Sequence, residues 1–168
     1  MEVKDTMADE NGIHVRKASS GDTELLLQLI GELAEFERIS HEVITTREIL
    51  RESLFGTKPA AEAVIAELDG MTAGFAVYFN NFSTFVGRPG LYIEDLYVRQ
   101  ELRGKGIGKA LFKHCARVAV ERNLGRVEWA VLRWNPAQEF YQHFGAEPMN
   151  DWVIYRLVGD NLKKLAES

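Results

Sequence analysis

The chain has 168 residues, which is enough for one domain with a single hydrophobic core. Apolar residues make up 46% of it and charged residues 27%, ordinary proportions for a globular protein. The net charge of −5 argues against nucleic acid as a partner, because duplex binding usually leaves a basic footprint. The single cysteine, Cys115, excludes an internal disulfide and a thiolate metal cluster, and it suits a reducing, cytoplasmic setting.

The N-terminal residues are polar. We expect residues 1–12 to form a polar arm and residues 13–168 to form a single domain, because no Pro/Gly/Ser-rich linker divides the rest of the chain. The arm lacks the apolar core of a signal peptide, and no stretch approaches the roughly 18 apolar residues that a membrane span needs. The sequence therefore predicts no membrane partner.

The first half begins with a strand and two helices. Apolar and polar residues alternate over 13–19, which predicts a short strand. Leucines at helical spacing predict a helix over 23–37. A second helix is predicted over 45–55, with Thr45 or Thr46 as its N-cap and Gly56 at its end.

A β-hairpin and a third long strand follow. Residues 62–68 and 72–82 have strand patterns, and the pair Asp69-Gly70 between them supplies the positive φ angles of a tight turn. After the loop "GRPG", residues 91–98 ("LYIEDLYV") predict another strand.

The second half alternates helices and strands. The pattern predicts a helix from Gly106 to about Asn123, a strand over 126–133, a short helix over 136–144 and a last strand over 151–158. Cys115 lies on the apolar face of its helix, which favours a buried small hydrophobe over a nucleophile. The element order is α+β in character, with one strand-helix-strand crossover in the second half.

The run "RGKGIG", residues 103–108, joins a predicted strand to a predicted helix. The first N–H groups of a helix have no internal partners and carry partial positive charge, and glycines let an anion approach them without meeting a Cβ. Arg103 and Lys105 would add Coulomb attraction, so the run predicts a pyrophosphate site. Its spacing fits neither a Walker A loop nor a G-x-G-x-x-G dinucleotide fingerprint, and a simple glycine-rich connection is the alternative.

Two separated motifs resemble one known superfamily. The run Arg103-x-x-Gly106-x-Gly108 resembles the Q/R-x-x-G-x-G/A signature of the Gcn5-related N-acetyltransferases (GNAT). Downstream, "WNPAQEFYQHFGA" (134–146) is similar to the segment in which these enzymes place an asparagine, an aromatic-tyrosine pair and a closing glycine. The phrases "ELAEFE", "FSTFVGR" and "LYIEDLYV" resemble the diamine acetyltransferase branch, which includes spermidine/spermine and thialysine N-acetyltransferases.

The resemblance runs from about residue 13 to the C-terminus and implies a fold and a co-substrate. The fold is a three-layer α/β arrangement in which a central mixed, splayed β-sheet is flanked by helices. The co-substrate is acetyl-CoA, with no metal, and the four histidines show no metal-ligand spacing. By resemblance, the cofactor would be bound by Leu96, Tyr97, Val98, Arg103, Gly104, Lys105, Gly106, Ile107, Gly108, Lys109 and Asn135.

Acetyl transfer to an amine needs an unprotonated amine and a proton for the leaving thiolate. Glu94 is the candidate for taking the proton from the amine, directly or through water. Tyr141 is the candidate general acid, because the matching tyrosine of the family has that role. The alternatives are a carboxylate that faces water at a strand end and a tyrosine that only packs in the core.

The acceptor end should carry negative charge, since the resemblance implies a small cationic amine. The substrate-binding candidates are Phe36, Glu37, Glu94, Asp95, Glu128, Trp129 and Trp152, and solvated faces are the alternative for Glu37 and Glu128. Ser83 and Thr84 resemble the thialysine group, where the spermidine/spermine enzymes carry an acidic residue and a tryptophan. One residue is also missing between Asn135 and Tyr141 relative to the usual spacing.

These observations predict an acetyl-CoA-dependent N-acetyltransferase that transfers acetyl directly to a primary amine. The expected acceptor is thialysine- or lysine-like or a short diamine, with polyamines as longer candidates. The alternatives are a protein or peptide amine acetyltransferase and a non-catalytic acyl-CoA-binding module. The resemblance also implies a homodimer, because members of this branch pair through their C-terminal strands.

Overall fold

The computed structural model describes residues 11–168, so most of the predicted arm lies outside the described residues. The chain divides into two compact units, one ending at Ala130 and one formed by Val131–Ser168. The single domain expected over 13–168 stays a prediction.

The first unit contains a five-stranded sheet with the strand order β1-β2-β3-β4-β5. The strands are β1 (Ile13–Lys17), β2 (Glu62–Leu68), β3 (Met71–Ser83), β4 (Arg88–Val98) and β5 (Val127–Trp129). The first four pair in an antiparallel manner, whereas β4 and β5 are parallel and joined through a helix. The mixed sheet and the single crossover are therefore confirmed.

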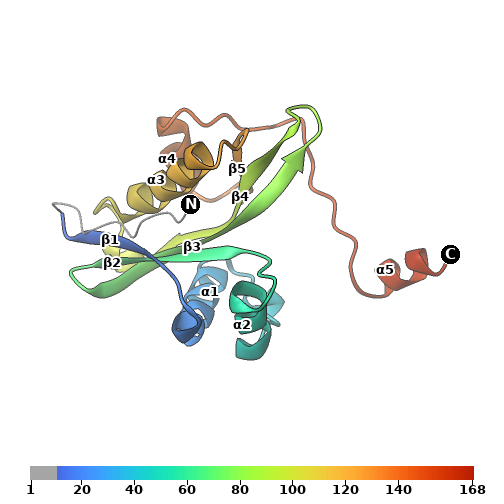
Figure 1. Cartoon of the computed structure of the whole chain (residues 1–168), viewed down its shortest axis with the longest axis horizontal. Helices are drawn as coiled ribbons and strands as arrows, with labels where there is room; N and C mark the ends of the chain where they lie inside the picture. Colours follow the sequence, from blue (N-terminus) through green and yellow to red (C-terminus); the bar gives the residue numbers. More distant parts are fainter. Residues whose placement is uncertain (1–10) are drawn as a thin grey trace. The chain divides into compact units, whose positions relative to one another are not determined.

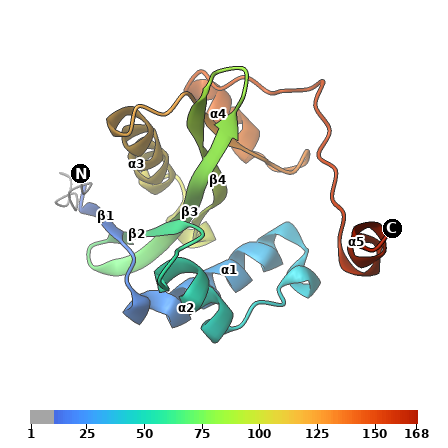
Figure 2. The same ribbon diagram turned by 45° about the vertical axis from the view of Figure 1, so that its right-hand side comes forward.

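Helices cover both faces of this sheet (Figures 1 and 2). Helices α1 (Thr23–Glu37) and α2 (Arg47–Phe55) bury Leu29 and Leu54 against one face, and α3 (Ile107–Glu121) buries Leu111 against the other. Cys115 of α3 is fully buried in the core between this helix and the sheet, as expected. Two apolar cores on opposite sides of one sheet make the three layers of the predicted α+β fold.

The local signals of the first half are largely confirmed. Helix α1 has the predicted bounds, and the hydroxyl oxygen of Thr46 accepts a hydrogen bond from the amide of Ile49 at the start of α2. Asp69 and Gly70 adopt φ angles of 50° and 78° in the hairpin turn. The prediction that "GRPG" is a loop is wrong in part. Ser83 of the long strand β3 pairs with Arg88, so β4 already begins at that residue.

Two strand predictions of the second half need correction. The strand over 126–133 forms only as β5, whose partners are Leu91–Ile93 of β4. The strand over 151–158 is wrong: these residues are exposed and belong to no strand in the described part of the chain. A strand requires a neighbour for its N–H and C=O groups, and a periodic sequence does not supply one.

The second unit contains two helices. Helix α4 (Ala137–His143) is the predicted short helix, and Gly145 follows it with a φ of 81°. Helix α5 (Gly159–Ala166) was not predicted from the sequence. Among the described residues, no helix is long and apolar enough to cross a membrane.

A β-bulge in β4 sets which side chains reach which face of the sheet. Tyr78 of β3 lies opposite Ile93 and Val77 lies opposite Asp95, so Glu94 is an extra residue. Side chains before the bulge, such as Ile93, and Val98 after it all join the core beneath α3. The bulge therefore leaves Asp95 on the opposite face, toward α1.

Gly74 lies where the backbones of β3 and β4 approach each other closely. A Cβ at this position would overlap the carbonyl oxygen of Tyr97. We expect Gly74→Ala to lower the free energy of unfolding by about 1–3 kcal/mol, because the backbone has to shift. Chemical denaturation measures this change.

Gly31 in α1 is the matched control, because a Cβ there would meet no atom within 4 Å. Gly31→Ala should raise the free energy of unfolding by about 0.5–1 kcal/mol, since alanine favours a helix interior. Equal effects of the two substitutions would contradict the steric explanation.

Candidate active site

The glycine loop between β4 and α3 presents backbone amides to solvent. Gly104 and Gly106 adopt φ angles of 79° and 91°, which side chains disfavour. The first N–H groups of α3 have no intrahelical partners, and Lys105 and Lys109 are exposed beside them. Exposed amides, partial positive charge and two cations fit a pyrophosphate.

Arg103, whose role at the pyrophosphate stays a prediction, contacts three residues of the first unit. Its Nε donates a hydrogen bond to the carbonyl oxygen of Val98 at 3.0 Å. Its guanidinium carbon lies 4.2 Å from the ring centroid of Phe36 and 5.8 Å from that of Tyr97. The side chain is therefore held against the end of β4 and against α1.

Strand β4 has a free edge where the sheet opens. Strand β5 pairs only with Leu91–Ile93, so residues 94–98 have no strand partner on that edge among the described residues. Leu96, Tyr97 and Val98 lie in this stretch. Their expected pairing with the pantetheine amides stays a prediction that this geometry permits.

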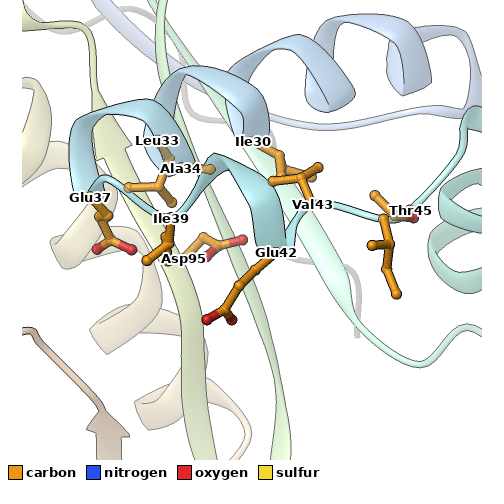
Figure 3. A pocket seen from close by; sticks show the side chains of 10 residues that line it. Ile30, Leu33, Ala34, Glu37, Ile39, Glu42, Val43, Thr45 and Asp95 are labelled. Atoms are coloured by element: carbon orange, nitrogen blue, oxygen red, sulfur yellow. The ribbon is translucent and has the colours of Figure 1, made fainter. Parts of the chain in front are cut away.

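Three carboxylates line an open hollow of about 280 Å³ on the α1 side of the sheet (Figure 3). Glu37 is the last residue of α1, Asp95 comes from β4, and Glu42 comes from the short 3₁₀ turn Ser40–Glu42. The rest of the lining is mostly apolar and consists of Ile30, Leu33, Ala34, Ile39, Val43, Ile44 and Thr45.

The hollow is electrostatically prepared for a cation. Burial, together with the negative charges of Glu94 and Glu37, raises the pKa of Asp95 to about 7. Burial also raises the pKa of Glu37. An ammonium group would relieve the repulsion among these carboxylates, and the apolar lining suits a methylene chain.

Other predicted residues of the first unit lie elsewhere. Glu94 is exposed at the bulge. Glu128 forms an ion pair with Arg126 at 2.7 Å, and Trp129 packs on Phe112 with ring centroids 5.2 Å apart. Neither Glu128 nor Trp129 lines the hollow, so the structure brings together Glu37 and Asp95 but does not add these two.

The predicted residues of the second unit lie in and around α4. Tyr141 is buried within this unit, and its ring lies 5.1 Å from that of Phe140. The side-chain oxygen of Asn135 accepts a hydrogen bond from the amide of Ala137 at 2.9 Å, which fixes the start of α4. Trp152 is exposed. The roles of Tyr141, Asn135 and Trp152 stay predictions.

Glu42 is the residue that the sequence did not reveal. It lies between α1 and α2 in a stretch without helical or strand periodicity. The one available signal was an acidic residue followed by Val43 and Ile44, and such a signal is common in loops. Among the described residues, no group of three or more potential ligands could hold a metal ion.

Comparison with known proteins identifies the family. A sequence profile of the Acetyltransferase (GNAT) family matches residues 26–146. The chain is a member of that family. It is 34% identical to thialysine N-epsilon-acetyltransferase of Bos taurus over 92% of this chain and 97% of the relative. It is 29% identical to the L-ornithine N5-acetyltransferase NATA1 of Arabidopsis thaliana, over 90% of this chain and 86% of the relative.

A solved structure shares this fold. An integron cassette protein from the mobile metagenome of V. cholerae has a TM-score of 0.77 and 28% identity, covering 94% of this chain and 99% of its own. The GNAT protein described here is thus an N-acetyltransferase of the diamine acetyltransferase branch. The family resemblance, the fold class and the enzyme class predicted from the sequence are confirmed.

The raised pKa of Asp95 predicts how acceptor binding by this GNAT enzyme depends on pH. Below pH 7 its carboxyl group is mostly neutral, and above pH 7 it is mostly ionised, while a primary amine stays cationic throughout. We expect the KM for the amine to fall about three- to tenfold from pH 6 to pH 8. Asp95→Asn should remove this dependence, and a variant with the wild-type pH profile of KM would exclude Asp95 from cation binding.

Proposed function

We propose that the enzyme transfers acetyl from acetyl-CoA to a primary amine of a small cationic molecule. Thialysine- or lysine-like amines and short diamines are the favoured acceptors, and polyamines are longer candidates. The observation that carries this proposal is the hollow in which Glu37, Glu42 and Asp95 surround an apolar lining. Its chemistry complements an ammonium group on a methylene chain.

The dimensions of the hollow favour a short acceptor. A volume of about 280 Å³ is at the small end for a ligand site. Ser83, which resembles the thialysine group, does not line the hollow; it is buried in the β3–β4 turn, where its hydroxyl accepts a hydrogen bond from the amide of Val86. The named activities of the bovine and Arabidopsis relatives, on thialysine and L-ornithine, support the same size class.

The loop over 103–109 is proposed to bind the pyrophosphate of acetyl-CoA. The amides after Gly104 and Gly106, together with Lys105 and Lys109, supply hydrogen bonds and positive charge. The free edge of β4 would pair with the pantetheine amides. Bound acetyl-CoA supplies an activated thioester, and Asn135 is assigned to the far end of the pantetheine arm.

Glu94 and Tyr141 are proposed to move the protons. Glu94 takes a proton from the substrate ammonium, directly or through water, and the freed amine attacks the thioester carbonyl. The new C–N bond forms as the C–S bond breaks, Tyr141 gives its proton to the leaving thiolate, and the second proton lost by the nitrogen restores the Tyr141 hydroxyl. No covalent bond to the enzyme forms in this direct transfer.

Two further proposals concern the setting of the enzyme. The exposed apolar segment around Trp152, Ile154 and Tyr155 supports a homodimer formed through the C-terminal region. The single cysteine supports a cytoplasmic location. Sedimentation that finds only monomer would exclude the homodimer.

A substrate panel tests the proposed acceptor. Thiol release from acetyl-CoA is measured with thialysine, lysine, ornithine, putrescine, spermidine, spermine and a lysine peptide. We expect the highest kcat/KM with thialysine or another short diamine, because the hollow is small. Preference for spermidine would overturn the size argument, preference for the peptide would favour a protein acetyltransferase, and CoA binding without turnover would favour a binding module.

Tyr141→Phe tests the proposed general acid. The substitution keeps the ring and removes only the hydroxyl group, so α4 should remain intact. We expect kcat to fall about 100-fold or more, because the thiolate loses its proton donor, while acetyl-CoA binding stays within about twofold. Retained turnover would remove Tyr141 from this role, and His143→Asn on the same helix is the matched control.

A further inference from the structure

Helix α1 contacts the segment that leads into the glycine loop at two residues, Arg99 and Arg103. Glu32 accepts hydrogen bonds from Nε and Nη2 of Arg99 at 3.0 and 2.9 Å, and Nη1 of Arg99 donates to the carbonyl oxygen of Thr72. One helical turn further along α1, the ring of Phe36 lies beneath the guanidinium of Arg103. Both contacts come from the same face of the helix.

Several contacts hold Arg103, the residue that begins the glycine loop, in place. Its Nε is bonded to Val98, its guanidinium faces two aromatic rings, and its own amide donates to the carbonyl oxygen of Gln100. Gly104 and Gly106 follow directly, and neither has a side chain that could anchor the loop. The far end of the loop is anchored by Ile107, which is buried in the core. The position of residues 104–106 therefore depends on how firmly Arg103 is held.

We propose that Phe36 is a positioning residue for the cofactor: its ring holds Arg103 and thereby aims the amides of residues 104–106 at the pyrophosphate. The inference rests on the proposed function, since it requires that this loop binds CoA. It gives Phe36 a task distinct from an aromatic wall for the acceptor. Loss of the ring then weakens CoA binding even when no acceptor amine is present.

The direct test is calorimetric titration of CoA into the purified enzyme without an amine. Phe36→Leu keeps an apolar side chain with good helix propensity but removes the π face. We expect the Kd for CoA to rise about three- to tenfold, the range of a partly desolvated cation–π contact. Phe36→Tyr retains the ring and should stay within about twofold of the wild type.

A double-mutant cycle separates positioning from general packing. Arg103→Met keeps the length of the side chain but removes the cation, so it should weaken CoA binding at least as much as Phe36→Leu does. The double variant should bind CoA no more weakly than the poorer single variant, because both changes break one contact. Effects that multiply in the double variant would overturn the proposal.

Phe55→Leu is the matched control, since Phe55 packs against the same core from α2. It should lower the thermal midpoint as Phe36→Leu does but leave the Kd for CoA unchanged. If Phe55→Leu weakens CoA binding equally, the effect of Phe36 is only one of stability. If wild-type enzyme binds no CoA, the proposed function itself fails, whereas CoA binding that ignores Phe36→Leu overturns only this inference.

Discussion

The extra residue in β4 is the constraint on which the first unit depends. A strand alternates its side chains between two faces, and one inserted residue reverses that alternation. Leu91 and Ile93 precede Glu94 and pack beneath α3, and Val98 packs there although its number is even. Without the bulge, Asp95 would point into the same apolar core. With it, the carboxylate faces α1 and the hollow.

That arrangement costs stability at neutral pH. A carboxyl group whose folded-state pKa lies above its unfolded value destabilises the fold as pH rises between the two values, and Asp95 is such a group. The ion pair of Glu32 with Arg99, elsewhere on α1, has the opposite effect on folding stability. Because Arg99 lowers the pKa of Glu32, this pair stabilises the fold as pH rises. A bound cation removes the cost at Asp95, so ligand binding and folding stability are linked.

Elements with local causes were predictable from the sequence. Helix α1 has its bounds because leucines recur at helical spacing, whereas the strand expected over 151–158 depends on a partner that sequence periodicity does not specify. In the hollow, Asp95 could be named from the strand motif. Glu42 could not, because its place follows from the path of an irregular segment. The packing of Trp129 against Phe112 of α3 likewise depends on tertiary structure, which the local sequence does not specify.

The burial of Cys115 has a practical consequence for enzymology. Its thiol is inaccessible between α3 and the sheet, and burial raises its pKa to about 12, so almost no thiolate exists near neutral pH. Since it is the only cysteine in the chain, the folded enzyme should be silent toward disulfide dyes and alkylating agents. The colour that a disulfide dye develops in a reaction mixture would then measure the released coenzyme thiol alone. A slow rise in the reactivity of the protein thiol would report unfolding.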